Sequence, residues 1–64
     1  MLIRLTSSFG GNVYVNPEYV VCVYPPTAIN KKGTNAVIEL RDSHTLQVTE
    51  DIDTVANLIN SERK

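Results

Sequence analysis

One cysteine and one histidine are the residues of this chain that could form a thiol–imidazole pair for nucleophilic catalysis. Cys22 is the single cysteine and His44 the single histidine, so they are the one thiol and imidazole that could act as nucleophile and base. No third side chain is identifiable as the group that orients the imidazole, and a cysteine within an apolar strand commonly packs as a small hydrophobe. We therefore expect no catalytic residues and predict that the protein is not an enzyme.

Three carboxylates, Glu50, Asp51 and Asp53, fall together in the sequence. They have the chemistry of an acid–base or metal-binding cluster, but carboxylates are also favoured at the positive N-terminal end of a helix. One histidine and one cysteine leave a metal cage short of ligands. The "GGN" of residues 10–12 lacks the spacing and the lysine of a phosphate-binding loop. We expect no metal site and no cofactor.

Aromatic and basic residues point to binding instead of catalysis. Tyrosines beside basic residues can stack on and clamp single-stranded nucleic acid, or they can form an interface with a protein. Six Lys and Arg against seven Asp and Glu give a net charge of −1, so no overall positive field favours nucleic acid. Protein contacts are our prediction and nucleic acid the alternative. The candidate partner-binding residues are Phe9, Tyr14, Tyr19, Tyr24, Asn30, Lys31 and Lys32.

The length of the chain favours self-association. Its 64 residues make one domain, 1–64, and a domain of this size buries only about 60 % of the surface of its unfolded chain. Small domains compensate with disulfides, metals or oligomerisation. A single cysteine excludes an internal disulfide, so we predict a homo-oligomer.

The opening "MLIRLT" is apolar but short, and Arg4 interrupts it. It therefore has the features of neither a signal peptide nor a membrane span. We expect a cytoplasmic protein without membrane insertion, whose lone thiol stays reduced.

The elements that position these residues follow from hydrophobic alternation. A period of two marks strands around residues 2–6, 12–16, 36–41 and 45–49. Residues 19–24 are apolar on both faces, so we expect one face of this strand on the core and the other against a second copy of the chain. Asn16 and Pro17 form a structural motif that ends the preceding strand, because proline donates no ladder hydrogen bond.

The period changes to that of a helix at Thr49. Ile52, Val55 and Ile59 recur at helical spacing, and Thr49 or Asp51 can cap the first turn. The predicted fold is α+β and β-rich: a small antiparallel sheet or partly open barrel of about five strands with one C-terminal helix. Residues 25–35 form a long loop that we expect to be mobile, either partner-binding or only solvated.

Sequence motifs along most of the chain resemble a known family. The segments "RLT", "VYVNPEYVVCV" and "TNAVIELRDSHTLQVTEDIDTVANLI" are similar to the FlbD/SwrD family of small flagellar proteins. This resemblance implies an accessory role in a flagellar, or phage-encoded, bacterial setting. The matching positions are Leu5, Thr6, Asn16, Pro17, Val37, Leu40, Val48, Glu50, Val55 and Ile59.

A second resemblance involves the start of the chain. "MLIRLT", followed by a strand-rich middle and a C-terminal helix, is similar to the carbon storage regulator family of RNA-binding dimers. This resemblance implies a small nucleic-acid-binding regulator, and it is the alternative to the protein-contact role.

Overall fold

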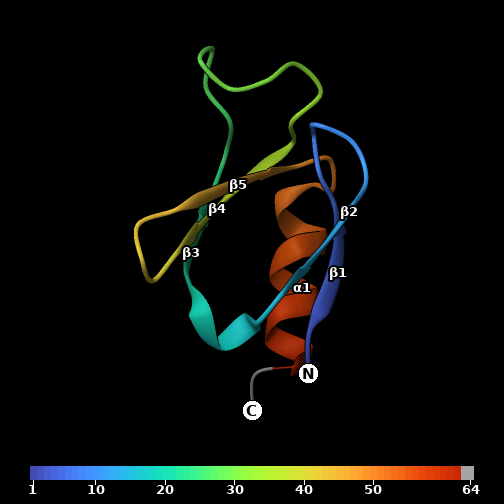
Figure 1. Cartoon of the computed structure of the whole chain (residues 1–64), viewed down its shortest axis with the longest axis vertical. Helices are drawn as coiled ribbons and strands as arrows, with labels where there is room; N and C mark the ends of the chain where they lie inside the picture. Colours follow the sequence, from blue (N-terminus) through green and yellow to red (C-terminus); the bar gives the residue numbers. More distant parts are fainter. Residues whose placement is uncertain (63–64) are drawn as a thin grey trace.

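The computed structural model describes residues 1–62 as five strands, one short 3-10 helix and one α-helix (Figure 1). The predicted β-rich α+β fold with a C-terminal helix is confirmed. The elements in chain order are β1 (Ile3–Thr6), β2 (Asn12–Val15), η1 (Pro17–Tyr19), β3 (Val20–Tyr24), β4 (Ala36–Leu40), β5 (Thr45–Val48) and α1 (Ile52–Glu62).

The strands form two antiparallel sheets. One is the β1–β2 hairpin, and the other has the order β3–β4–β5. In the hairpin Ile3 faces Val15 across the ladder and both are buried, whereas the next pair, Arg4 and Tyr14, is exposed. The period-two alternation that the sequence predicts therefore separates a core face from a solvent face.

The two sheets meet where β1 ends and β5 ends. Ser7 and Val48 form an isolated antiparallel bridge, and the Thr49 amide donates to the Thr6 carbonyl at 3.0 Å. The Thr6 amide donates in turn to both carboxylate oxygens of Glu50, at 2.9 and 3.0 Å. Residues 6–8 and 47–50 thus form a junction that joins the sheets. Glu50 is bonded to this strand end, not to the first turn of the helix.

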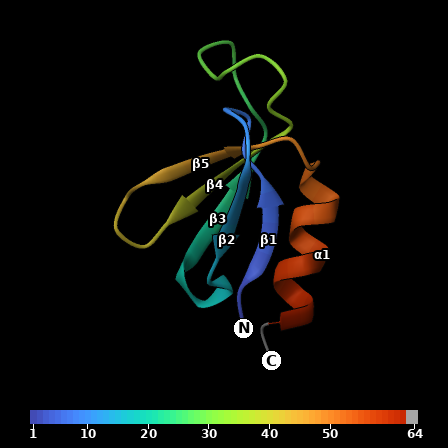
Figure 2. The same ribbon diagram turned by 45° about the vertical axis from the view of Figure 1, so that its right-hand side comes forward.

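Helix α1 begins after Asp51, which acts as its N-cap. The Asp51 carboxylate accepts from the Thr54 amide at 2.8 Å, and this hydrogen bond lowers the pKa of the Asp51 carboxyl. Val55 and Ile59 are the buried residues of the helix, one turn apart. Figures 1 and 2 both show α1 alongside β1, and it also contacts β3.

A single cluster of aliphatic side chains forms the core between the sheets and the helix. Its buried members are Ile3, Leu5, Val15, Val20, Ala36, Ile38, Val48, Val55 and Ile59. Val37 is also buried, on the side of β4 opposite to Ile38. The first three residues of the central strand β4 are therefore buried on both faces of the sheet.

The region around Pro17 differs in detail from the sequence prediction. Tyr19 belongs to η1 and not to the third strand. The Asn16 carbonyl accepts from the Tyr19 amide at 2.9 Å, and the Asn16 side chain accepts from the Glu18 amide at 3.0 Å. Pro17 is buried in this turn, and the turn connects β2 to β3. Cys22 is exposed, which corrects the expectation that it packs as a buried hydrophobe.

Replacing Leu5 should test how strongly the stability of the protein depends on a single core side chain. Leu5 is fully buried, so Leu5→Ala is expected to cost about 2 to 5 kcal/mol. A domain of this size has a total stability of about 3 to 10 kcal/mol, so the variant should lose a large fraction of its stability and unfold at a clearly lower urea concentration.

Leu2→Ala is the matched control, because Leu2 precedes the same strand and is 58 % exposed. Urea denaturation followed by circular dichroism measures both variants. Equal stability of the two variants would contradict the assignment of Leu5 to the core.

Candidate interaction surfaces

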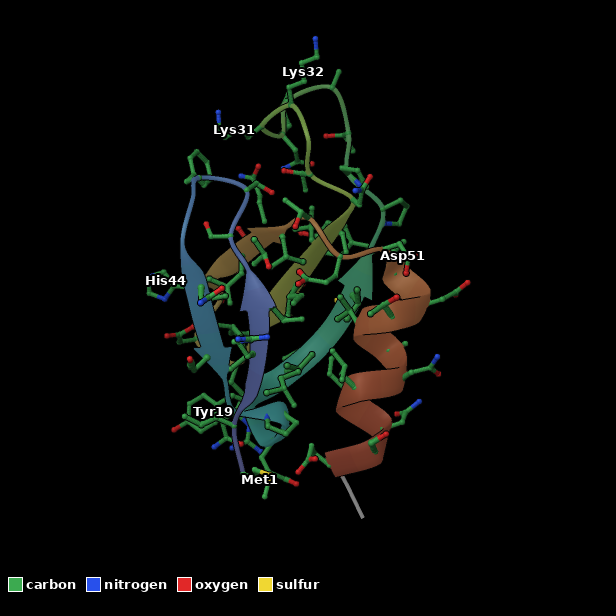
Figure 3. All side chains as sticks on the ribbon, turned by 90° about the vertical axis from the view of Figure 1, so that its right-hand side faces the viewer. Met1, Tyr19, Lys31, Lys32, His44 and Asp51 are labelled. Atoms are coloured by element: carbon green, nitrogen blue, oxygen red, sulfur yellow. The ribbon has the colours of Figure 1, made fainter. Side chains whose placement is uncertain are left out.

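The candidate binding residues lie at different places on the molecule. Figure 3 shows Lys31 and Lys32 at one end, and Tyr19 near Met1 at the other. Tyr14 is on the outer face of the β1–β2 hairpin, and Tyr24 ends β3. The sequence candidates therefore do not form one site. They divide into a loop tip, two tyrosine–arginine pairs and the exposed side of β3.

The loop tip consists of residues 7–11 and 25–35, and internal turns shape its longer segment. The Asn30 amide donates to the Thr27 carbonyl at 3.0 Å, and the Asn30 side chain accepts from the Thr27 amide at 2.7 Å. A second turn is closed by the Thr34 amide donating to the Lys31 carbonyl at 3.1 Å. Gly33 has a φ of 96° in this turn, a conformation that favours glycine.

Gln47 of β5 anchors this loop to the sheet. Its side-chain oxygen accepts from the Lys31 amide at 2.6 Å and from the Thr34 hydroxyl at 3.3 Å. The Thr34 hydroxyl also lies 2.7 Å from the Ser8 hydroxyl oxygen, which connects the two segments of the tip. The long segment that we expected to be mobile is thus held by hydrogen bonds. Sequence reasoning missed Gln47 because it occupies an ordinary outward position of an alternating strand.

The loop tip combines positive charge with exposed apolar groups. Phe9 is 68 % exposed and Ile29 is 92 % exposed. The Lys31 ammonium lies 5.5 Å from the centre of the Phe9 ring, within the range of a cation–π contact. Neither segment of the tip contains an Asp or Glu.

Two tyrosines each lie beside an arginine. Tyr14 faces Arg4 across the β1–β2 ladder, and the Arg41 guanidinium lies 5.6 Å from the centre of the Tyr19 ring. Both rings are about half exposed. In the described part of the chain no Lys or Arg side chain forms an ion pair with a carboxylate. Their charges are therefore available to an outside partner.

The exposed side of β3 is apolar. Val21, at the register shift between Val20 and Cys22, is 60 % exposed, and Tyr24 is 37 % exposed. We call Val21, Cys22 and Tyr24 the β3 surface. β3 pairs with β4 on one edge, and no other strand of residues 1–62 pairs with its second edge. The strand contains no charged residue and no proline.

Cys22 and His44 each interact with a different carboxylate. The Cys22 thiol donates to Glu39 at 3.4 Å, and this hydrogen bond to a carboxylate raises the pKa of Cys22. His44 Nδ1 lies 2.8 Å from Asp42, and hydrogen bonds from His44 lower the pKa of the Asp42 carboxyl. A raised thiol pKa reduces the thiolate that a nucleophile requires. The arrangement therefore does not activate Cys22.

Sites of other kinds are absent from the part of the chain that the structure covers. Residues 1–62 contain no group of three or more His, Cys, Asp or Glu side chains able to hold a metal ion, and no pocket. Within the same residues no helix has the length and apolarity needed to cross a membrane.

Comparison with protein-family models, with curated proteins and with solved structures gives no match to this chain. The resemblance to the FlbD/SwrD family and the weaker one to the carbon storage regulator family stay predictions. The geometry described above is therefore the basis for a functional proposal.

The Cys22–Glu39 contact predicts how the thiol reacts. Glu39→Gln removes the negative charge beside the thiol, so the pKa of Cys22 should fall and alkylation by iodoacetamide should become faster at mildly alkaline pH. Asp42→Asn removes the same charge elsewhere and should leave the rate unchanged. Identical pH–rate profiles for Glu39→Gln and the native protein would disprove the contact.

The Gln47 anchor predicts how the loop tip opens. Gln47→Met keeps the length of the side chain but lacks the accepting oxygen, and loss of the anchor should cost about 1 kcal/mol of local stability. Trypsin should then cleave after Lys31 or Lys32 about fivefold faster, because cleavage tracks the population of the open loop.

Gln47→Glu retains accepting oxygens and serves as the control. It should be cleaved at the native rate, as followed by mass spectrometry of the fragments. Equal cleavage of all three proteins would mean that Gln47 does not hold the loop.

Proposed function

We propose that this protein is a non-catalytic interaction module that acts through protein contacts as a homo-oligomer. The observation that carries the proposal is the β3 surface, where Val21, Cys22 and Tyr24 are exposed on an uncharged strand that pairs with only one other strand of residues 1–62. Such edges are templates for pairing with another chain unless charge, proline or cover blocks them. A second copy of the chain would bury these side chains and add to a thin core.

The size of the protein supports the same proposal. The core cluster has nine buried residues, all aliphatic, whereas two of the three tyrosines and the one phenylalanine are about half exposed or more. Aromatic side chains contribute large apolar areas to interfaces. The molecule therefore keeps its largest apolar groups outside its own core, as a module that binds other chains does.

The proposed setting is cytoplasmic, where an exposed thiol remains reduced. The resemblance of the sequence to the FlbD/SwrD family supports an accessory role in a bacterial flagellar or phage-encoded system. The β3 surface and the loop tip supply places at which such a module can contact other proteins.

Nucleic-acid binding is the second candidate, and the tyrosine–arginine pairs favour it. Tyr14 beside Arg4 and Tyr19 beside Arg41 combine a partly exposed ring with a cation that has no carboxylate partner among residues 1–62. This combination suits the stacking of bases and the neutralisation of phosphates. The net charge of −1 disfavours it relative to protein contacts.

A charge placed on the β3 surface should disrupt the oligomer. Sedimentation equilibrium of the native protein at micromolar concentration should give a multiple of the 7.1 kDa chain mass, and Val21→Lys should shift the distribution to the monomer. Ile29→Lys places the same charge on an exposed apolar residue of the loop tip and should leave the oligomer intact. A native protein that sediments at 7.1 kDa throughout would contradict the proposal.

The salt dependence of binding distinguishes the two candidate functions. The nucleic-acid role predicts that the protein binds a fluorescein-labelled oligo(dT) and that this binding weakens steeply as salt rises. It also predicts that Arg4→Ala and Arg41→Ala lose this binding. Self-association through an apolar surface should change little over the same range of salt.

A further inference from the structure

We propose that the loop tip is a binding site for an acidic segment of another protein that also carries apolar side chains. This inference rests on the proposed function, since it names a partner class for the interaction module. It concerns a surface other than the one proposed for self-association. The tip lies at one end of the longest axis of the molecule, beyond the ends of the strands (Figures 1 and 3).

Charge is strongly segregated between the loop tip and the rest of the chain. The tip carries Lys31 and Lys32 and no carboxylate, a net charge of +2. The other residues carry four Lys and Arg against all seven Asp and Glu, a net charge of −3. The overall value of −1 therefore conceals a positive end, which is complementary to an acidic partner.

Apolar side chains accompany the two lysines. Phe9 and Ile29 are the most exposed large apolar residues of the tip, and Lys31 is positioned over the Phe9 ring. An ammonium held there keeps its N–H donors for a carboxylate while the ring remains accessible to an apolar neighbour. A partner that alternates Asp or Glu with Leu or Phe satisfies both kinds of group.

The loop tip is pre-organised for binding. The Lys31 amide is bonded to Gln47 and the Thr34 hydroxyl to Ser8, so the backbone next to both lysines is fixed before a partner arrives. A pre-ordered loop loses less conformational freedom on binding than a mobile loop. The two lysines are therefore presented to a partner at a lower entropic cost than a mobile loop would incur.

The composition of the tip favours a protein segment over the other anionic partners. Single-stranded nucleic acid is bound by several cations with successive aromatic platforms, and the tip offers two lysines and one ring. Stable attachment to an anionic membrane uses larger clusters of Lys and Arg. An acidic, apolar peptide can be matched by two cations and two apolar side chains.

Selection from a random peptide library displayed on phage tests the proposal. The native protein is the bait, and the Lys31→Glu, Lys32→Glu double variant is used for counter-selection. The enriched peptides should combine Asp or Glu with aromatic or aliphatic residues. A fluorescein-labelled copy of an enriched peptide should bind the double variant about tenfold or more weakly. Asn60→Glu places a negative charge on an exposed position of α1, away from the tip, and should leave the affinity unchanged.

Three results would overturn the proposal. The first is a set of enriched peptides with no excess of acidic residues, and the second is an equal affinity of these peptides for the native protein and the double variant. In the third case the double variant instead abolishes binding to labelled oligo(dT) or to phosphatidylglycerol vesicles while no acidic peptide is selected. Sedimentation equilibrium on the same proteins distinguishes this failure from that of self-association, because the oligomer should persist in the double variant.

Discussion

The junction between residues 6–8 and residues 47–50 is the interaction on which the rest of the structure depends. It joins the two sheets through the bridge of Ser7 with Val48, and the Glu50 carboxylate satisfies the amide at the end of β1. Without these bonds the β1–β2 hairpin would be linked to the three-stranded sheet mainly by side-chain packing, and an isolated two-stranded hairpin is marginal in water. The same junction places Ser8 beside Gln47 and thereby positions the loop tip.

The tip and the β3 surface follow from this arrangement as two surfaces with different chemistry. The first is ordered by side-chain hydrogen bonds that reach from β5 into the loop, and it gathers positive charge. The second is an uncharged strand that pairs with only one other strand of the described chain. A small domain can thus associate with itself through one surface and contact a different partner through the other.

Local patterns predicted most of the elements but not the contacts between them. Alternation in "AVIEL" and the helical spacing of Val55 and Ile59 specify burial directly, since each depends on neighbours within a few residues. The order of residues 25–35 depends on Gln47, which is more than ten positions away and has an ordinary strand context. Cys22 is exposed on a face of β3 that follows the register shift between Val20 and Cys22, and such an irregularity in the pairing of distant strands cannot be derived from local alternation.

Native-state amide hydrogen exchange tests most directly whether the junction holds the loop tip in place. The Ser8 amide donates to the Gln47 carbonyl at 2.9 Å and the Lys31 amide to the Gln47 side chain, so both should exchange slowly. The Ile29 amide donates no hydrogen bond within the described residues and should exchange at nearly the rate of an unstructured chain. Exchange of Ser8 and Lys31 as fast as that of Ile29 would contradict the account.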